Sequence, residues 1–593
     1  MDGRPGALEN RESWRLSARL AKLLPFLESL RGYNGNLLAS DALAGVIVTI
    51  MLIPQSLAYA LLAGLPAEMG LYASILPLVA YALLGTSRTL SVGPVAVASL
   101  MTAAAVGNIA AAGSAGYAAA AIVMALLSGG MLFLMGCLRF GFLANFLSHP
   151  VVSGFITASG IIIGLSQLRH ILGVEGHGET LPQLLQSLAE QVAHFNTVTL
   201  VTGVAATAFL FWARKGLKAL LLRMGLGDTV AGFLAKTGPV LVIIATTLAS
   251  YLGDFAGHGV KLVGEVPSGL PAFALPVFDP GLWSELAVSA LLISIIGFVE
   301  SVSVGKTLAA KRRQRVDPNR ELVALGAANV ASAVSGGFPV TGGFSRSVVN
   351  FDAGAQTQAA SIIAAGGIGL AALLLTPVLY FLPKATLAAT IIVAVTSLID
   401  LGVVRRAWQY SLSDFIAVVT TIGATLLLGV ELGVLAGIVA SISLHLYKTT
   451  RPHIAVVGAV AGTEHFRNVE RHNVITQPNI ISLRVDESLY FANAAYLEDY
   501  IYGLVADIDG LEHVILQCTA VNEIDLSALE ALEAINHRLQ EQGLTLNLSE
   551  VKGPVMDALQ KSHFLQQLSG QVFLTHHQAV KALKADEIEP YII

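Results

Sequence analysis

Two short stretches that contain glycine and proline indicate the fold: SVGPVAVAS at residues 91–99 and GFPVTGGFS at residues 337–345. Each opens an apolar segment that is shorter than its neighbours, and the two stand at corresponding places in the two halves of the chain. Paired, interrupted segments of this kind are typical of transporters built from inverted repeats, in which they form the binding site. Two unrelated Gly-rich faces for helix packing are the alternative interpretation.

Apolar runs recur on both sides of these stretches. A membrane-spanning helix needs about 20 mostly apolar residues. Clear runs of this kind are found at 41–63, 69–84, 117–137, 147–168, 196–213, 237–252, 284–305, 358–382, 385–399, 413–430 and 432–447. Shorter or interrupted runs are found at 92–108, 322–335 and 339–352. The pattern predicts a polytopic α-helical membrane protein with about 14 segments.

The composition agrees with this and divides the chain. Of its 593 residues, 54% are hydrophobic and 13% are charged, whereas a soluble protein carries about 25% charged residues. Residues 451–593 hold 9 Lys and Arg against 19 Asp and Glu, while residues 1–450 hold the other 26 and 21. We therefore expect a cytoplasmic N-terminal segment at 1–39, a transmembrane domain at 40–450 and an acidic domain at 451–593. A basic surface for nucleic acid is lacking.

The acidic domain has a different periodicity. Strands are predicted at 480–485, 489–493, 513–518 and 544–548, and helices at 495–506, 526–542, 553–567 and 578–584. Strands that alternate with helices predict an α/β domain. Its paired His576 and His577 are expected to be solvated. The two cysteines, Cys137 and Cys518, lie in apolar surroundings and predict no disulfide.

The distribution of Lys and Arg predicts the orientation in the membrane. With a cytoplasmic N-terminus, the inside loops receive most of the basic residues, and the outside loops receive only Arg169, Lys261 and Lys384. An excess of Lys and Arg marks cytoplasmic loops. We therefore predict a multi-pass protein of the inner (plasma) membrane with both termini in the cytoplasm.

Two charged residues fall within apolar segments. Glu300 and Arg346 would each cost at least about 2.5–3.5 kcal/mol at the bilayer centre, so each is expected to have a partner or to face water. In the functional interpretation, Arg346 attracts an anion and Glu300 exchanges a proton or balances charge. In the alternative, the two form a buried pair that fixes helix packing, or Glu300 pairs with Lys306.

Broken helices add to this site. Half-helix N-termini expose free N–H groups and the positive end of a dipole, which bind anions, and the hydroxyl of Ser345 can add a donor. The sequence shows one firm intramembrane carboxylate, Glu300, which favours an anion over a cation. Gln55 and Tyr59 share one face of a helix kinked at Pro54; a kinked core helix is the alternative.

Other chemistry finds no support in the sequence. The histidines show no metal-ligand spacing, and there is neither a Walker A motif nor a Ser-His-Asp pattern. We therefore expect neither an enzyme nor a metal or other cofactor.

Several motifs resemble one known family. PAEMGLYAS at 66–74, followed by GTSR at 85–88, resembles the signature of the SulP sulfate permease family. Residues 54–60, 91–99, 298–307 and 341–350 match further blocks of that family in order, and the C-terminal domain resembles a STAS domain. The resemblance implies a 7+7 inverted repeat with core and gate domains, a homodimer and elevator-like alternating access. It also implies transport of sulfate, bicarbonate, chloride or dicarboxylates, often with H⁺ or Na⁺.

The resemblance assigns roles to individual residues. Gln55 and Tyr59 match substrate-binding positions of the first helix, and Glu300 matches the position for ion coupling. Two further groups match the half-helices of the third and tenth segments: Val95, Ala96, Val97 and Ala98, and Phe344, Ser345 and Arg346. Ser527 matches the phosphorylated serine of regulatory STAS proteins, but the turn Asp525-Leu526-Ser527-Ala528 departs from their pattern, which favours helix capping.

The expected function is sulfate:proton symport, with Na⁺-coupled bicarbonate transport, anion exchange or dicarboxylate transport as alternatives within transport. A nucleobase permease shares the implied fold, but it usually lacks a STAS tail and carries acids in place of Arg346. A membrane-tethered signalling module would not need the embedded charges. A passive anion channel is a further alternative, because the sequence does not distinguish coupled from uncoupled transport. The expected partners are a small inorganic anion, the lipid bilayer, a second copy of the chain and a cytoplasmic protein that binds the STAS domain.

Overall fold

A computed structural model describes residues 24–29, 33–145, 148–176, 178–265, 269–374, 376–506, 508–584 and 591–592. The chain divides into two compact units, Met1–Ser441 and Ile442–Ile593. Of the expected N-terminal segment at 1–39, residues 1–23 and 30–32 lie outside the described residues. Residues 35–39 belong to the first long helix, α3 (Gly35–Leu62).

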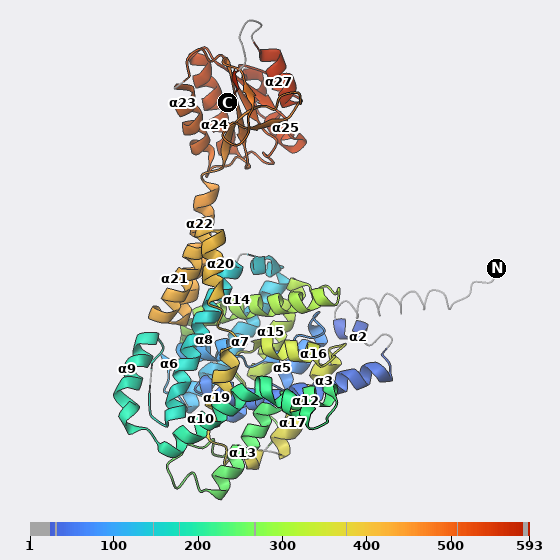
Figure 1. The fold of residues 1–593 in the computed structure, drawn as a ribbon, viewed down its shortest axis with the longest axis vertical. Coiled ribbons are helices and arrows are strands. Elements are labelled where there is room, and N and C mark those ends of the chain that lie inside the picture. Colours follow the sequence, from blue (N-terminus) through green and yellow to red (C-terminus); the bar gives the residue numbers. More distant parts are fainter. Residues whose placement is uncertain are drawn as a thin grey trace, which may run out of the picture. The chain divides into compact units, whose positions relative to one another are not determined.

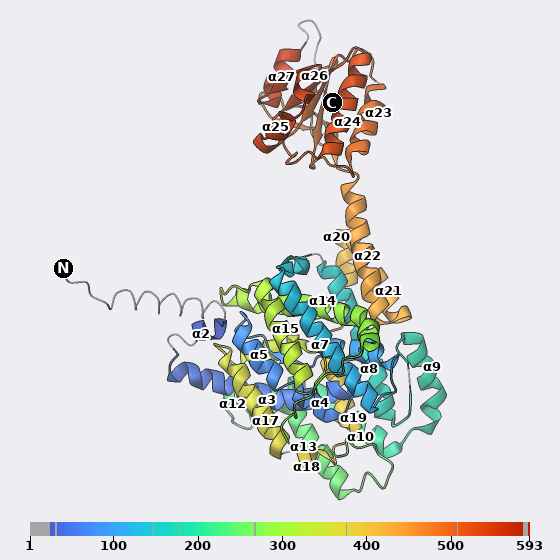
Figure 2. The same cartoon turned by 180° about the vertical axis from the view of Figure 1, so that it is seen from behind.

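The first unit is built of helices (Figures 1 and 2), and each predicted membrane segment contains at least one of them. The first half contributes α4 (Ala67–Tyr72), α5 (Leu76–Leu84), α6 (Ala96–Gly107), α7 (Ala115–Cys137), α8 (His149–Leu172), α10 (Thr197–Trp212) and α13 (Gly238–Leu252). The second half contributes α14 (Pro280–Lys311), α15 (Pro318–Val334), α16 (Phe344–Asp352), α17 (Ala359–Leu374), α19 (Lys384–Val395), α21 (Leu412–Leu428) and α22 (Val430–Thr449).

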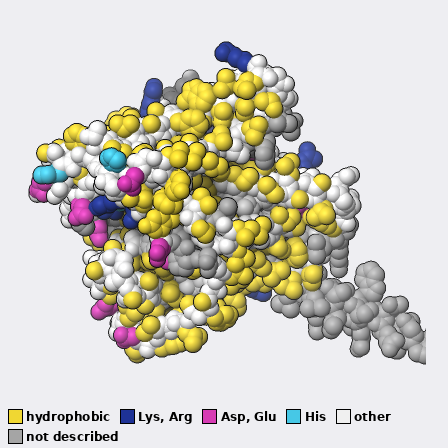
Figure 3. Space-filling view, turned by 90° about the horizontal axis from the view of Figure 1, so that it is seen from below, with side chains coloured by type: hydrophobic (Ala, Val, Ile, Leu, Met, Phe, Trp, Pro, Cys, Tyr) yellow, Lys and Arg dark blue, Asp and Glu magenta, His cyan; other side chains and the backbone are white. Residues whose placement is uncertain are grey.

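Shorter helices connect these or lie between them. They are α2 (Pro25–Ser29), α9 (Leu181–Gln191), α11 (Lys218–Arg223), α12 (Asp228–Lys236), α18 (Thr376–Leu379) and α20 (Gly402–Tyr410). Among the described residues, 7 helices are long and apolar enough to cross a membrane, and further apolar helices are shorter. Figure 3 shows one face of the molecule, where apolar side chains cover much of the surface and charged side chains are few.

Two minimal strands join the halves of this unit. β1 (Val92–Gly93) pairs antiparallel with β2 (Thr341–Gly342), with Val92 opposite Gly342 and Gly93 opposite Thr341. α6 begins shortly after β1, and α16 begins shortly after β2. The two interrupted stretches of the sequence therefore lie side by side, and two helices start from their junction.

Close helix packing relies on small residues. α7 and α15 pack against each other, and a Cβ atom at Gly129 would lie only 2.7 Å from the backbone nitrogen of Val330. Small residues let the two helix backbones approach closely. In a membrane, such close van der Waals packing holds helices together, because the hydrophobic effect does not drive one helix against another. The main buried cluster joins α5, α6, α7, α14 and α15 around large side chains such as Tyr81, Met124 and Phe298.

A second buried cluster joins helices from different parts of the unit. Tyr59 of α3 and Ala96 of α6 belong to it together with Ile163 of α8 and with Leu387 and Ile391 of α19. α19 packs against both α3 and α8. The contact between these two helix pairs therefore consists largely of apolar side chains.

The second unit holds a mixed sheet in the order β10-β5-β3-β6-β7-β8-β9, with β4 paired to β3. The strands are β3 (Ile454–Ala459), β4 (Phe466–Asn468), β5 (Ile475–Thr476), β6 (Ile480–Val485), β7 (His513–Gln517), β8 (Thr545–Ser549), β9 (Val572–Phe573) and β10 (Tyr591–Ile592). The helices are α23 (Ala494–Ala506), α24 (Leu526–Glu541), α25 (Gly553–Leu559), α26 (Phe564–Gln567) and α27 (His576–Leu583). Neighbours from β6 to β9 run parallel.

Side chains of this sheet alternate between two buried faces. Val514 and Leu516 pack in the core formed with α23, α24 and α25, while Ile515 packs with Ala579 of α27. The strand predicted at 489–493 is wrong: only Leu489 forms a bridge there, with Ile524. The predicted helix at 553–567 is divided into α25 and α26.

Candidate anion-binding site

The site begins where α6 and α16 start. Their N-cap residues, Val95 and Gly343, make no side-chain hydrogen bond to the helices that follow. The first N–H groups of a helix have no partner within it, so residues 96–98 and 344–346 present free donors at the β1–β2 junction. Two positive helix ends therefore meet in one place.

Arg346 lies in the first turn of α16 and is 2% exposed. Its Nη2 donates to the carbonyl of Thr341 at 3.4 Å, while Nη1 is buried and finds no hydrogen-bond partner among the residues that the structure describes. The guanidinium packs on glycines of both stretches: a Cβ atom would lie 2.8 Å from Nη1 if built at Gly93 and 2.7 Å from Nε if built at Gly343. A buried cation with an unused donor is costly unless an anion or a polar ligand joins it.

Glu300 approaches the same place from α14. It is partly exposed and lines a cavity of ≈ 10 Å³ together with Val97, Ala98 and Thr341, which is about the room that one water molecule needs. Glu300 and Arg346 interact electrostatically, but no ion pair within 4.0 Å joins them among the described residues. Lys306 is exposed on the same helix, and none of these ion pairs joins it to Glu300.

Hydrogen bonds fix β2 against α14. The Ser301 hydroxyl lies 2.8 Å from that of Thr341 and accepts from the Gly342 N–H at 2.9 Å. The Thr341 hydroxyl donates to the carbonyl of Gly297 at 2.8 Å. This network ties β2, which directly precedes α16, to Gly297 and Ser301 on either side of Glu300, so the backbone that carries the cation is fixed relative to the helix that carries the acid.

The first-helix residues reach the site unequally. Tyr59 is 8% exposed and interacts electrostatically with both Arg346 and Glu300. Gln55 lies one turn earlier on α3 and is half-buried. Phe344 and Ser345 are exposed, the former at 50%, whereas Val95 to Ala98 are buried. The structure thus brings Tyr59, Glu300 and Arg346 together.

Sequence reasoning missed a buried carboxylate at the start of α15. Glu321 is fully buried and accepts four hydrogen bonds: from the Tyr81 hydroxyl at 2.6 Å, from the N–H and hydroxyl of Thr86 at 2.8 and 2.6 Å, and from the Ser87 N–H at 3.2 Å. It fixes the turn that leads into β1. Thr86 and Ser87 belong to the GTSR motif at 85–88, which is the sequence signal that could have drawn attention to this turn.

A second missed carboxylate lies near the start of α3. Asp41 is also fully buried, and it accepts from the N–H groups of Gln356 and Thr357 at 2.6 and 3.1 Å and from the Thr357 hydroxyl at 2.6 Å. The sequence interpretation counted one embedded carboxylate, Glu300, and the structure buries two more within the helical unit. Both additional groups are satisfied by neutral donors, which leaves the preference for an anion at Arg346 intact.

The C-terminal unit holds the last site candidate. Ser527 is exposed in the first turn of α24, and Asp525 caps that helix by accepting from the Ala528 N–H at 2.9 Å. His576 is fully buried, with Nδ1 2.8 Å from the Ser549 hydroxyl, so the prediction that it is solvated is wrong.

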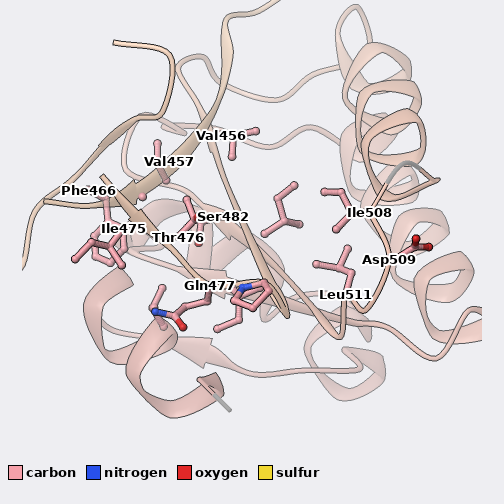
Figure 4. Close-up of a pocket in the computed structure, with 15 residues that line it drawn as sticks. Val456, Val457, Phe466, Ile475, Thr476, Gln477, Ser482, Ile508, Asp509 and Leu511 are labelled. Atoms are coloured by element: carbon pink, nitrogen blue, oxygen red, sulfur yellow. The ribbon is translucent and has the colours of Figure 1, made fainter. Parts of the chain in front are cut away.

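A pocket of ≈ 310 Å³ lies between β3, β5, β6 and α27 and is lined mainly by apolar side chains (Figure 4). It contains none of the predicted site residues.

Comparison with protein families decides the identity. Residues 38–421 match the model of the "Sulfate permease family", and residues 471–579 match that of the STAS domain. The chain belongs to the sulfate permease family. It is thus a membrane-spanning protein of a family of anion transporters, rather than of enzymes, and it carries a C-terminal STAS domain.

Individual members of the sulfate permease family align along almost the whole chain. "Sulfate transporter 4.1, chloroplastic" of Arabidopsis thaliana is 34% identical over 96% of this chain and 83% of its own length. A probable sulfate transporter of Mycobacterium tuberculosis is 33% identical over 94% of this chain and 98% of its own. "High affinity sulfate transporter 2" of Stylosanthes hamata is 31% identical over 95% and 86%.

Solved structures show the same fold. The murine anion transporter solute carrier 26 family member A9 superposes with a TM-score of 0.85 and 24% identity, covering 95% of this chain and 94% of that one. The transmembrane domain of a cyanobacterial bicarbonate transporter gives a TM-score of 0.58 and 22% identity, over 69% and 98%. At these identities the likeness concerns the fold alone.

Proposed function

We propose that this chain is a secondary active sulfate transporter that couples sulfate to H⁺ by elevator-type alternating access. The observation that carries the proposal is Arg346: a buried guanidinium at the uncapped start of a half-helix, whose Nη1 has no hydrogen-bond partner in the described part of the chain. The names of the relatives, which are sulfate transporters from plants and a bacterium, support sulfate as the anion.

In the proposed binding step, sulfate enters between the starts of α6 and α16. Residues 96–98 and 344–346 offer backbone N–H donors, Arg346 offers a fixed cation, and Gln55, Tyr59 and Ser345 offer polar side chains. Two helix N-termini and one guanidinium can neutralise a divalent anion without a second buried cation. The ≈ 10 Å³ cavity beside Glu300 leaves no room for sulfate itself, so the anion sits on the Arg346 side of that cavity.

Glu300 is the proposed proton carrier. Its carboxylate interacts with Arg346 without a direct ion pair, so the bound anion and the carboxylate compete for the same positive potential. Sulfate binding therefore favours the protonated form of Glu300, and by linkage protonation strengthens sulfate binding by the same factor. Such cooperativity is what symport requires.

The elevator step is supported by the apolar contact of α3 and α6 with α8 and α19. Tyr59 and Ala96 meet Ile163, Leu387 and Ile391 there, and no hydrogen bond between these two helix pairs occurs among the described residues. A contact surface without directional bonds can slide at low cost, because few hydrogen bonds must be broken. The proposal places α3 and α6 with the moving site and α8 and α19 with the scaffold.

We further propose a homodimer in the inner (plasma) membrane, with both termini cytoplasmic and the STAS domain as a docking point for a cytoplasmic protein. Exposed Ser527 at the start of α24 is the position at which phosphorylation would change that surface. Protease accessibility of the C-terminal unit in intact vesicles tests the orientation, and crosslinking in the membrane tests the dimer.

The central test is uptake of labelled sulfate, bicarbonate and succinate into proteoliposomes with imposed pH or Na⁺ gradients. We expect sulfate accumulation driven by a pH gradient. Arg346→Ala is expected to weaken sulfate binding by about 30-fold or more without unfolding, while Arg405→Ala, which alters an exposed arginine, serves as the matched control. A folded Arg346→Ala variant with the parent's sulfate affinity would overturn the site, and accumulation driven only by Na⁺ would overturn the coupling.

A further inference from the structure

The only three basic residues that the Lys and Arg distribution assigns to outside loops come together in the structure. Arg169 lies in the last turn of α8, Lys384 begins α19, and Lys261 lies in the loop that pairs with the residue before α19. The Lys384 N–H donates to the Lys261 carbonyl at 3.0 Å. We refer to Arg169, Lys261 and Lys384, with the neighbouring His170, as the outer basic cluster.

The members of the outer basic cluster are close enough to act on one another. His170 interacts electrostatically with Arg169, Lys261 and Lys384, and Lys384 interacts with Lys261. The described contacts bring one carboxylate to them: Glu175 forms an ion pair with Lys261 at 2.9 Å. Three cations against one carboxylate leave an excess of positive charge, which is unfavourable for stability and favourable for holding an anion.

Arg169 is held in place but not saturated. Its Nη1 donates to the carbonyl of Gly176 at 2.5 Å, which anchors the guanidinium to the residue after Glu175. Its Nε is buried and has no hydrogen-bond partner among the described residues. The Lys261 side chain, by contrast, is 49% exposed. The cluster therefore combines a fixed, unused donor with a charge that solvent can reach.

The cluster lies on the helices that adjoin the central site. α19 packs against α3, which carries Gln55 and Tyr59, and α8 packs against α19. The apolar contact of α3 and α6 with α8 and α19 is the one along which the proposed site would move. An anion held by the last turn of α8 and the first turn of α19 would therefore lie at one end of that contact.

We propose that the outer basic cluster is an anion-capture site, which binds a divalent oxyanion such as sulfate from the outer solution before it reaches Arg346. The proposal rests on the proposed function and orientation, and it adds a second, weaker binding step. Long-range attraction by exposed charges raises the rate of encounter at low ionic strength and is screened by salt. Binding at the buried Arg346 is screened much less.

Salt dependence provides the test. The KM for sulfate uptake is measured at about 0.01 M and 0.15 M ionic strength, in phosphatidylcholine vesicles whose enclosed C-terminal unit resists added protease. We expect Lys261→Gln combined with Lys384→Gln to raise KM about tenfold at low ionic strength and about twofold or less at 0.15 M. Two single variants at one position provide a control: Lys384→Gln should raise KM at low ionic strength, whereas Lys384→Arg, which keeps the charge, should leave KM close to that of the parent. Lys215→Gln, an exposed lysine of the first unit on a predicted inside loop, should match the parent.

The outcomes separate the possible causes. If the double variant has the same KM for sulfate as an active parent at low ionic strength, the capture site is refuted, while the proposed sulfate transport is unaffected. If KM differs by the same factor at both ionic strengths, the variant has damaged the central site and the proposal fails. If the difference appears only when anionic lipid is added, the cluster binds a lipid headgroup and not the free anion. A parent that moves no sulfate refutes the proposed function instead.

Discussion

The guanidinium of Arg346 rests against Gly93, where a Cβ atom would lie 2.8 Å from Nη1. The two residues belong to different halves of the chain and meet because β1 pairs with β2. The proposed anion-binding cation is thus supplied by one repeat and held in place by a glycine of the other.

Gly93→Ala tests this contact. The φ angle of 159° and the approach of Nη1 leave no room for a methyl group, so the flexible guanidinium must shift while the fold persists. We expect the KM for sulfate to rise several-fold with a smaller change in maximal rate, measured by uptake kinetics. Gly113→Ala, at a positive φ of 80° in open space, controls for backbone strain alone. A variant with the parent's KM would show that the guanidinium position does not set affinity.

Glu300→Gln tests proton coupling. The amide is neutral at every pH and has nearly the same shape, so the variant imitates the protonated acid. It should bind sulfate and exchange it across the membrane, but lose the accumulation that a pH gradient drives. The parent should take up sulfate faster as the external pH falls. If the variant concentrates sulfate as well as the parent does, Glu300 is structural and another group carries the proton.

Glu321→Ala tests the role of the buried carboxylate at the start of α15. Removing the acceptor leaves the Tyr81 hydroxyl and the N–H groups of Thr86 and Ser87 buried without partners, and each costs about 1–3 kcal/mol. We expect a loss of about 3 kcal/mol or more, seen as a clear fall in Tm in detergent. Glu285→Ala, at an exposed position of α14, should leave Tm unchanged. An unaltered Tm for both variants would contradict the structural role.

His576 should make the STAS domain sensitive to acid. Burial lowers the pKa of His576 to about 4, partly opposed by the charge of Glu550. Between the unfolded pKa of about 6.5 and the folded pKa, the unfolded chain binds the extra proton, so stability falls as the pH falls. The loss approaches about 3 kcal/mol at the lower end.

Denaturant unfolding of residues 451–593 between pH 7.5 and 4 measures this effect. The buried His576→Gln variant should show a shallower pH dependence, whatever its stability at pH 7.5. His577→Gln should keep the slope of the parent. Equal slopes in all three proteins would show that another group controls the acid sensitivity.

Deleting residues 451–593 should leave a membrane unit that folds and binds sulfate. The compact first unit ends at Ser441, α22 ends at Thr449, and every proposed binding residue precedes them. Transport is expected to weaken but not to vanish, as measured by uptake and size-exclusion chromatography. Loss of sulfate binding in an intact truncated protein would contradict the placement of the site. Full transport with an unchanged oligomeric state would show that the C-terminal domain serves only as a docking module.

Much of the membrane unit could be predicted because its physical signal is local. Apolar runs identify membrane helices without knowledge of their neighbours, and the Gly- and Pro-containing stretches identify the broken ones. The C-terminal sheet was harder to predict at its edge. β4, β5 and β9 are too short to show periodicity, and residues 489–493 alternate like a strand although only Leu489 finds a partner.

The amino-acid sequence by itself determined the apolar segments, the acidic α/β domain and the residue types of the proposed anion site: Arg346, Glu300 and the two interrupted stretches. Only the tertiary structure decided which of these meet. It joined Gly93 to Arg346 and left Glu300 without a direct ion pair among the described residues. It also buried Asp41 and Glu321 among hydrogen-bond donors that include residues more than 200 positions away. The physical reason is that hydrophobic periodicity is local, whereas the burial and pairing of a charge depend on donors brought together across the chain.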